Sequence, residues 1–161
     1  MTTPPSGAIT PPAVPVVMAP ALVAELRRTW QLVAPMADEV AQLFYERLFE
    51  IDPSLRALFQ TDPGVRRRKL MDALEFVVTR VDRPDELIPM LTALGQRHAG
   101  YGVRPEHYAV VGEALLWTLD EGVGALRTPH ARDAWVQTYE LISATMRADE
   151  GRSLEPGHRS T

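Results

Sequence analysis

Leu87-Ile88-Pro89-Met90-Leu91-Thr92-Ala93-Leu94-Gly95-Gln96-Arg97-His98 is a stretch in which three leucines and one histidine share a helical spacing. The four residues stand at positions i, i+4, i+7 and i+11, which places them on one face of an α-helix. The leucines predict that this face packs into a core, and two nearby glycines end the helix. A neutral imidazole on an apolar face is either hydrogen-bonded or a metal ligand, and this stretch alone leaves both alternatives open for His98.

The composition is that of an ordinary globular chain. Its 161 residues suffice for one domain with a sizeable core, and 45% are hydrophobic while 24% are charged. The net charge of −4 gives no overall bias toward nucleic acid or an anionic membrane. The absence of cysteine excludes disulfides, thiolate metal sites and cysteine catalysis, and it fits the cytoplasm, where we expect the protein to work.

The chain divides into three parts. Residues 1–19 are uncharged and rich in proline, so we expect a flexible tail there rather than a signal peptide. Residues 20–150 carry helical patterns and are expected to form one domain, and residues 151–161 are expected to be a second tail. No apolar run approaches the ~18 residues that a membrane span requires.

Prolines mark the beginnings of the predicted helices, because the missing N–H of proline is tolerated in the first helical turn. Asp52, Asp62 and Thr128 stand directly before three of them and are good N-caps. No run of alternating β-branched residues predicts a strand, so the sequence predicts an all-α domain of six or seven helices. The prolines in question are Pro20, Pro35, Pro53, Pro63, Pro84, Pro105 and Pro129.

Five short motifs, taken in order, resemble those of the globin family. Each motif alone is weak, but their order and spacing are those of single-domain bacterial globins and neuroglobin, and the nearest likeness is to the neuroglobin-like globins of the Hell's Gate type. The resemblance covers about residues 21–148 and implies a globin fold, a three-over-three helical sandwich enclosing a haem. The motifs are Phe44–Phe49, Asp52–Gln60, Arg68–Met71, Leu94–His98 and Tyr101–Val103.

The resemblance implies that His98 is the proximal ligand of a haem b iron, bound through Nε2, and that the opposite iron face is open to a gas. The other ring nitrogen should donate to a backbone carbonyl one turn earlier. Packing of Trp30, Trp135 and Tyr139 should join the first and last helices. The residues expected to contact the haem are Phe59, Lys69, Leu70, Leu74, Leu91, Leu94, Val103, Tyr108 and Val111.

Two residues bear on the chemistry of the distal side. Tyr45 matches the family position that points at bound ligand, where its phenol could donate a hydrogen bond to O₂; the alternative is a buried tyrosine bonded to backbone. Arg66 stands where the family usually has histidine or glutamine. It is either a gate of the distal pocket, able to stabilise a ligand, or part of a solvated run of arginines.

The resemblance implies a haem protein that binds O₂, CO and NO and, with O₂ bound, oxidises NO to nitrate. No reductase domain fits 161 residues, so turnover would need a separate electron donor. The alternatives are an O₂ carrier or gas sensor, an Arg66-assisted peroxidase or nitrite reductase, and a haem-free helical scaffold. We expect a monomer or weak homodimer that binds neither nucleic acid nor membrane.

Overall fold

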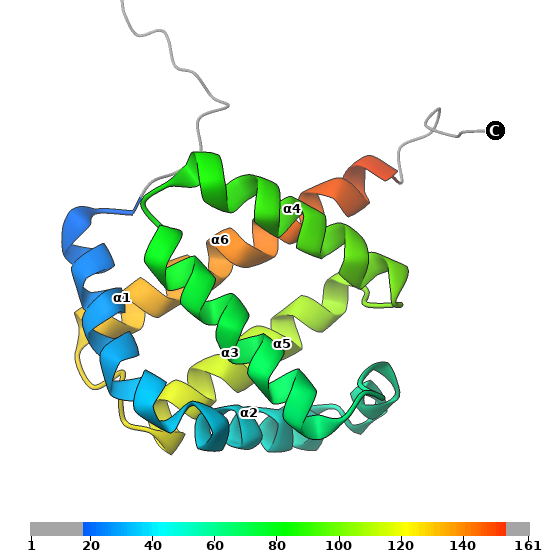
Figure 1. Cartoon of the computed structure of the whole chain (residues 1–161), viewed down its shortest axis with the longest axis horizontal. Coiled ribbons are helices and arrows are strands. Elements are labelled where there is room, and N and C mark those ends of the chain that lie inside the picture. Colours follow the sequence, from blue (N-terminus) through cyan, green and yellow to red (C-terminus); the bar gives the residue numbers. More distant parts are fainter. Residues whose placement is uncertain (1–17, 154–161) are drawn as a thin grey trace, which may run out of the picture.

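The computed structural model describes residues 18–153, and it describes side chains as far as residue 148. Every regular element in that range is helical, which confirms the all-α prediction (Figure 1). The α-helices are joined by two 3₁₀ segments, η2 (Ala34–Met36) and η3 (Pro53–Leu58), and by one π-helical turn, η4 (Thr118–Gly122). The α-helices are α1 (Pro20–Val33), α2 (Ala37–Ile51), α3 (Pro63–Arg80), α4 (Pro84–Gly100), α5 (Pro105–Trp117) and α6 (Pro129–Ser153).

The predicted helix starts are largely correct. Five of the prolines are the first residues of α-helices, and Pro53 begins η3, whereas Pro35 lies in the middle of η2. The Asp52 carboxylate accepts a hydrogen bond from the Ser54 N–H at 3.1 Å, and that of Asp62 accepts from the Val65 N–H at 3.2 Å. The Thr128 hydroxyl likewise accepts from the Ala131 N–H at 3.1 Å. These caps satisfy donors that the first turn leaves without a helical partner.

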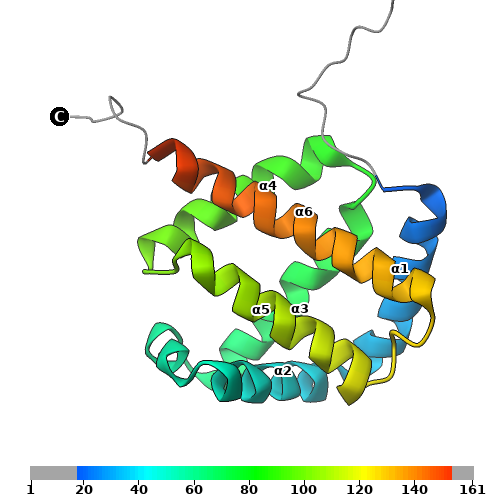
Figure 2. The ribbon, with the colours of Figure 1, turned by 180° about the vertical axis from the view of Figure 1, so that it is seen from behind.

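The helices form two layers. Figure 1 shows α1, α3 and α4 in front, and Figure 2 shows α2, α5 and α6 in front when the molecule is seen from behind. Between the layers, α4 packs on α6, α1 on α6 and α3 on α2. This is the expected three-over-three arrangement. No helix within residues 18–153 is long and apolar enough to cross a membrane.

The first and last helices are joined through their tryptophans. The ring centroids of Trp30 and Trp135 lie 6.3 Å apart, and the Trp135 indole N–H donates to the buried Thr29 hydroxyl at 2.7 Å. Met18 belongs to the stretch expected to be a tail, but its side chain is only 6% exposed, and its sulfur accepts a hydrogen bond from the Thr138 hydroxyl. The core therefore begins before α1, while residues 1–17 lie outside the described part of the chain.

A glycine allows close contact between α4 and α6. Gly95 is buried, and a Cβ at this position would collide with the backbone of Met146 on α6. The absence of a side chain therefore lets the two backbones approach more closely than any other residue would allow. This contact sets how closely the C-terminal half of α4, which carries His98, lies against α6.

Candidate functional site

His98 lies in the last turn of α4 and is half-buried. Its Nδ1 lies 2.9 Å from the carbonyl oxygen of Leu94, one turn earlier. A carbonyl can only accept, so Nδ1 carries the proton and Nε2 presents a lone pair. Burial lowers the pKa of His98; the bond to Leu94 opposes that effect, and the charge of Arg97 adds to it. The ring is thus held as a neutral, oriented donor of one electron pair, as a metal ligand must be.

Tyr45 lies on α2, and its ring is buried among aromatic side chains. It meets the ring of Phe59 edge-on at a centroid distance of 5.4 Å and that of Phe44 at 5.0 Å. Its hydroxyl donates to the Arg66 carbonyl at 3.4 Å, which is long for an O–H···O bond. Burial raises the pKa of Tyr45 to about 12, against a smaller lowering by the Arg66 charge, so the phenol keeps its proton at neutral pH.

The Arg66 side chain is partly buried and bonded to neighbouring residues, so it is neither solvated nor free within the distal pocket. Its Nη1 donates to the carbonyl of Phe59 at 2.9 Å, and its guanidinium carbon lies 5.0 Å from the Tyr45 ring centroid. Its Nε is buried and has no hydrogen-bond partner within the described residues. Arg66 therefore contacts both Tyr45, which was expected on the distal side, and Phe59, which was expected to contact the haem.

The residues expected to contact a haem fall into two separate apolar clusters. One cluster contains the distal set, from α2, the residue that follows η3, α3 and α5, and the second contains the proximal set, from α4, the segment that follows it and the start of α5. The two clusters meet at Leu141, which packs against both, and the residues expected to contact a haem are divided between them. The distal set is Tyr45, Phe59, Leu70, Leu74 and Val111; the proximal set is Leu91, Leu94, Val103 and Tyr108.

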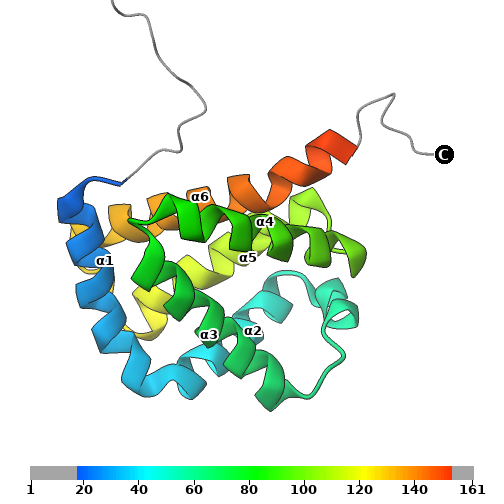
Figure 3. The same cartoon turned by 45° about the horizontal axis from the view of Figure 1, so that its top comes forward.

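The residues near His98 are less buried than the rest of the leucine face of α4. The end of α4 that carries His98 and the 3₁₀ segment η3 lie at the same end in Figures 1 and 3. Along the leucine face of α4, Leu87 and Leu91 are fully buried, whereas Leu94 and His98 are only half-buried. The apolar face of α4 is thus less buried toward His98, as expected of a surface that contacts a bound ligand. Lys69 is exposed, and no ion pair within residues 18–148 involves it.

The donor set fits a porphyrin better than a bare metal ion. Within the described residues no group of three or more His, Cys, Asp or Glu side chains could hold a metal ion. A haem iron needs only one or two protein ligands, because the porphyrin supplies four nitrogens. The remaining histidines have other surroundings: His107 accepts the Arg104 N–H at 2.9 Å as part of a helix cap, His130 is exposed, and His158 lies outside the described residues.

Sequence reasoning missed a second feature next to Tyr45. A pocket of about 260 Å³ lies between α2, η3 and the start of α3, and its lining includes Phe49 and Arg56. The Arg56 and Arg66 guanidinium carbons lie 4.7 Å and 5.4 Å from the centroid of the Phe49 ring. The only signal in the sequence is that Phe49 stands four residues after Tyr45, on the same face of α2.

Known proteins resemble this chain over most of the described range. A family model described as Globin matches residues 42–146. The chain belongs to the globin family. Globins are haem-binding proteins, so membership implies that this chain binds haem. The narrower likeness to neuroglobin-like globins stays a prediction.

Several curated relatives are flavohemoproteins. That of Rhodopirellula baltica is 32% identical over 127 residues, which are 77% of this globin and 31% of the relative. That of Rhizobium meliloti is 31% identical over 133 residues, 81% of this globin and 33% of the relative. That of Bacillus subtilis is 28% identical over 121 residues, which are 73% of this globin and 30% of the relative. This globin therefore spans about a third of the length of the curated relatives it matches.

Proposed function

We propose that this globin binds haem b through His98, takes up O₂, CO and NO on the opposite side, and oxidises NO to nitrate when O₂ is bound. The observation that carries the proposal is the division of the apolar core, with an oriented neutral imidazole on one side and a protonated phenol on the other. Haem would supply a ferrous iron that binds O₂, and reaction with NO would leave nitrate and ferric iron.

The residues of the chain would hold and select the ligand. Nε2 of His98 would bind the iron, while the Nδ1–H bond to Leu94 fixes the ring and raises its basicity. Tyr45 would turn its hydroxyl from the Arg66 carbonyl to bound O₂, which carries partial negative charge and accepts a hydrogen bond. Because the existing bond is 3.4 Å long, exchanging it costs little. The apolar walls would exclude water.

Arg66 would act through its neighbours rather than by touching the gas. Its bond to the Phe59 carbonyl and its stacking over the Tyr45 ring hold the distal pair in place. We therefore assign it a positioning role, and no observation favours an Arg66-assisted peroxidase or nitrite reductase. The flavohemoprotein relatives support the haem and O₂ parts of the proposal. Electrons for turnover would come from a donor outside the described residues, in the cytoplasm where we place this globin.

The test is a stopped-flow reaction of the reduced, oxygenated protein with NO. We expect rapid formation of the ferric spectrum, with one nitrate produced per haem. Replacing Tyr45 by phenylalanine should speed the loss of O₂ before NO arrives and so lower the nitrate yield. Slow or absent conversion would overturn the NO-oxidising proposal, while a stable oxygenated spectrum without nitrate would leave a carrier or sensor as the function.

A further inference from the structure

The pocket behind Tyr45 is distinct from the division between the clusters. It lies between α2, η3 and the first turns of α3, and the Tyr45 ring forms part of its wall. Its volume of about 260 Å³ exceeds what one water needs, at ~30 Å³. Its rim is exposed at Gln42, Glu46 and Arg56, so a small solute can enter from solvent.

Two cations in this pocket lack a carboxylate partner. The Arg56 and Arg66 guanidinium groups both lie over the Phe49 ring, and neither forms an ion pair within residues 18–148. Arg67, which also lines the pocket, differs, because its Nε donates to the Asp38 carboxylate at 2.8 Å. The buried Nε of Arg66 makes no hydrogen bond at all in the described part of the chain. The pocket lining therefore contains two guanidinium groups that no carboxylate pairs with within residues 18–148.

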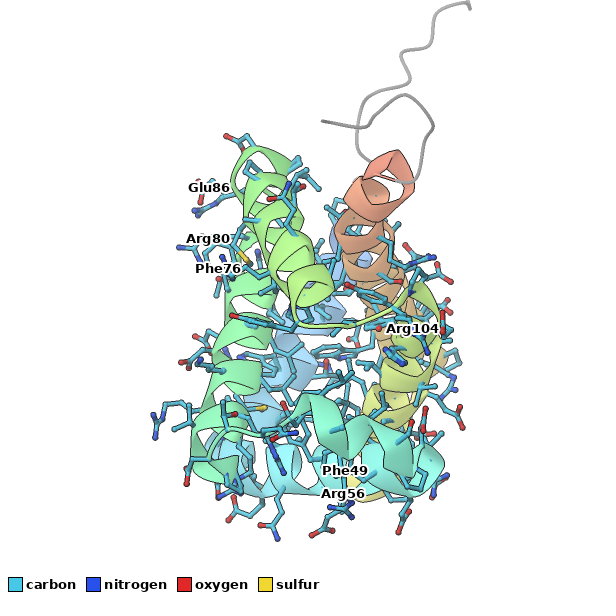
Figure 4. The ribbon with its side chains drawn as sticks, turned by 90° about the vertical axis from the view of Figure 1, so that its right-hand side faces the viewer. Phe49, Arg56, Phe76, Arg80, Glu86 and Arg104 are labelled. Carbon is cyan, nitrogen blue, oxygen red and sulfur yellow. The ribbon has the colours of Figure 1, made fainter. Side chains whose placement is uncertain are left out.

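Arg80 provides a contrast, because it is a stacked arginine that does have a carboxylate partner. Arg80 also lies over an aromatic ring, that of Phe76 at 4.0 Å, but its Nε donates to the Glu86 carboxylate at 3.2 Å. Figure 4 shows Arg80, Phe76 and Glu86 together on one side of the molecule. Arg56 lies beside Phe49 at the lower edge of the molecule in the same view. A stacked guanidinium with a carboxylate is neutralised, whereas Arg56 and Arg66 offer their charge to an external group.

We propose that the pocket lined by Phe49, Arg56 and Arg66 binds a small planar oxyanion, of the kind represented by nitrate and short carboxylates. The guanidinium fork matches two coplanar oxygen atoms, and two guanidinium groups, each within 5.4 Å of the Phe49 ring centroid, line this pocket. The anion would accept hydrogen bonds from the Arg56 and Arg66 guanidinium groups where they line the pocket. The pocket shares Tyr45 and Arg66 with the proposed distal side, but binding of the anion requires neither haem nor the NO reaction.

The negative charge of Glu46 would repel a bound anion, so removing that charge tests whether binding depends on the charge of the pocket. Its carboxylate lies in the pocket lining and accepts from Gln42 at 3.2 Å, which ties it to the α2 side of the rim. Removing its charge should strengthen anion binding, whereas removing either unpaired arginine should weaken it. Arg68 is the matched control, because it belongs to the same run of arginines on α3 but is exposed and is not part of the pocket lining.

The experiment is a titration of the full-length protein with sodium nitrate and, separately, sodium acetate. The ionic strength is held constant with sodium chloride, and the Arg Nε–H resonances are followed by ¹H–¹⁵N NMR in reduced, CO-saturated buffer. We expect a saturable shift of the Arg66 resonance. Arg56→Met and Arg66→Met should weaken binding about tenfold or more, Glu46→Gln should tighten it about twofold, and Arg68→Met should leave it unchanged.

Specific outcomes would overturn the proposal. A shift that grows linearly without saturating, or an equal response when chloride alone is varied, would show only a general ionic effect. Equal affinity in Arg56→Met and Arg68→Met would show that the pocket is not the site. If Arg66→Met does not fold, Arg66→Lys takes its place, because lysine keeps the positive charge but lacks the guanidinium fork. The Arg66→Lys variant should lose the preference for planar anions over chloride. Because the readout is an arginine resonance, it is valid whether or not the protein carries haem.

Discussion

The proximal and distal sides of this globin are held in different ways. On the proximal side the polar contacts are short: His98 donates to Leu94 at 2.9 Å within one turn of α4, and the Tyr139 hydroxyl donates to the Tyr108 carbonyl at 2.6 Å. On the distal side Arg66 donates to the Phe59 carbonyl at 2.9 Å, but the Tyr45 hydroxyl itself reaches the Arg66 carbonyl only at 3.4 Å, across 21 residues of sequence. The proximal side is organised in advance to hold a cofactor, while the distal side keeps a donor that a ligand can recruit.

The largest expected effect follows from removing the proximal donor. His98→Ala should lower haem retention by more than ~100-fold, because loss of the metal ligand exceeds the ~10–100-fold cost of losing an outer partner. The measurement is transfer of haem to an acceptor protein, followed at the Soret band, and added imidazole should partly restore binding. His130→Ala is the control, since His130 is exposed. Equal retention in both variants would refute the proximal assignment.

Gly95→Ala tests whether the proximal side depends on the close approach of α4 to α6. The new methyl group would meet the Met146 backbone, which cannot yield as a side chain could, so we expect a loss of about 1–3 kcal/mol or more in the free energy of unfolding. Gly100→Ala, on the same helix, has open space around the added carbon and should be neutral or stabilising by about 1 kcal/mol or less. Urea unfolding of both variants gives the comparison.

Tyr45→Phe tests the distal side. It removes one hydrogen-bond donor but keeps the edge-on contact with Phe59, so the fold should be little affected. Loss of a hydrogen bond worth about 1–2 kcal/mol should speed O₂ dissociation about 5- to 30-fold. The measurement is O₂ displacement by CO in a stopped-flow instrument, with Tyr101→Phe as the control because that ring is 72% exposed. An unchanged rate would mean that Tyr45 stays bonded to the Arg66 carbonyl when O₂ is bound.

The same contrast explains what the sequence predicts about the fold. Helix starts follow from residues next to one another in the chain, such as Asp62 before Pro63, and they were predicted well. The sequence did not predict the π-helical turn at Thr118–Gly122 or the burial of Met18, because both depend on packing against distant segments. Gly122, for example, lies against the Leu43 side chain of α2, and no spacing rule connects those two residues.

The candidate site divides in the same manner. The bond from His98 to Leu94 is a one-turn contact, and a backbone carbonyl one turn earlier is the partner that the resemblance to globins implied. The Arg66 side chain, by contrast, takes its direction from Phe59 and Phe49, which lie on η3 and α2. From the sequence alone it could equally be solvated or enter the distal pocket. The pocket with Arg56 could not be predicted, because three elements form it.

The smallest effect at neutral pH concerns the two buried tyrosines. Burial raises the pKa of Tyr45 to about 12 and that of Tyr139 still further, whereas tyrosine in an unfolded chain ionises near pH ~10. A group with a raised folded-state pKa contributes stability that is complete below the unfolded pKa. That contribution is lost as the pH rises toward the folded value.

We therefore expect the free energy of unfolding to be level from pH 7 to 9 and to fall between about pH 10 and 12, by roughly 1 kcal/mol per pH unit for each buried tyrosine. Urea unfolding at successive pH values measures this decline. Tyr139→Phe should reduce the slope and, by removing the 2.6 Å bond to Tyr108, also lower stability at pH 7, whereas Tyr45→Phe should reduce the slope alone. If both variants lost equal stability at neutral pH, the distal hydroxyl would be as firmly held as the proximal one, and the contrast between the two sides would fail.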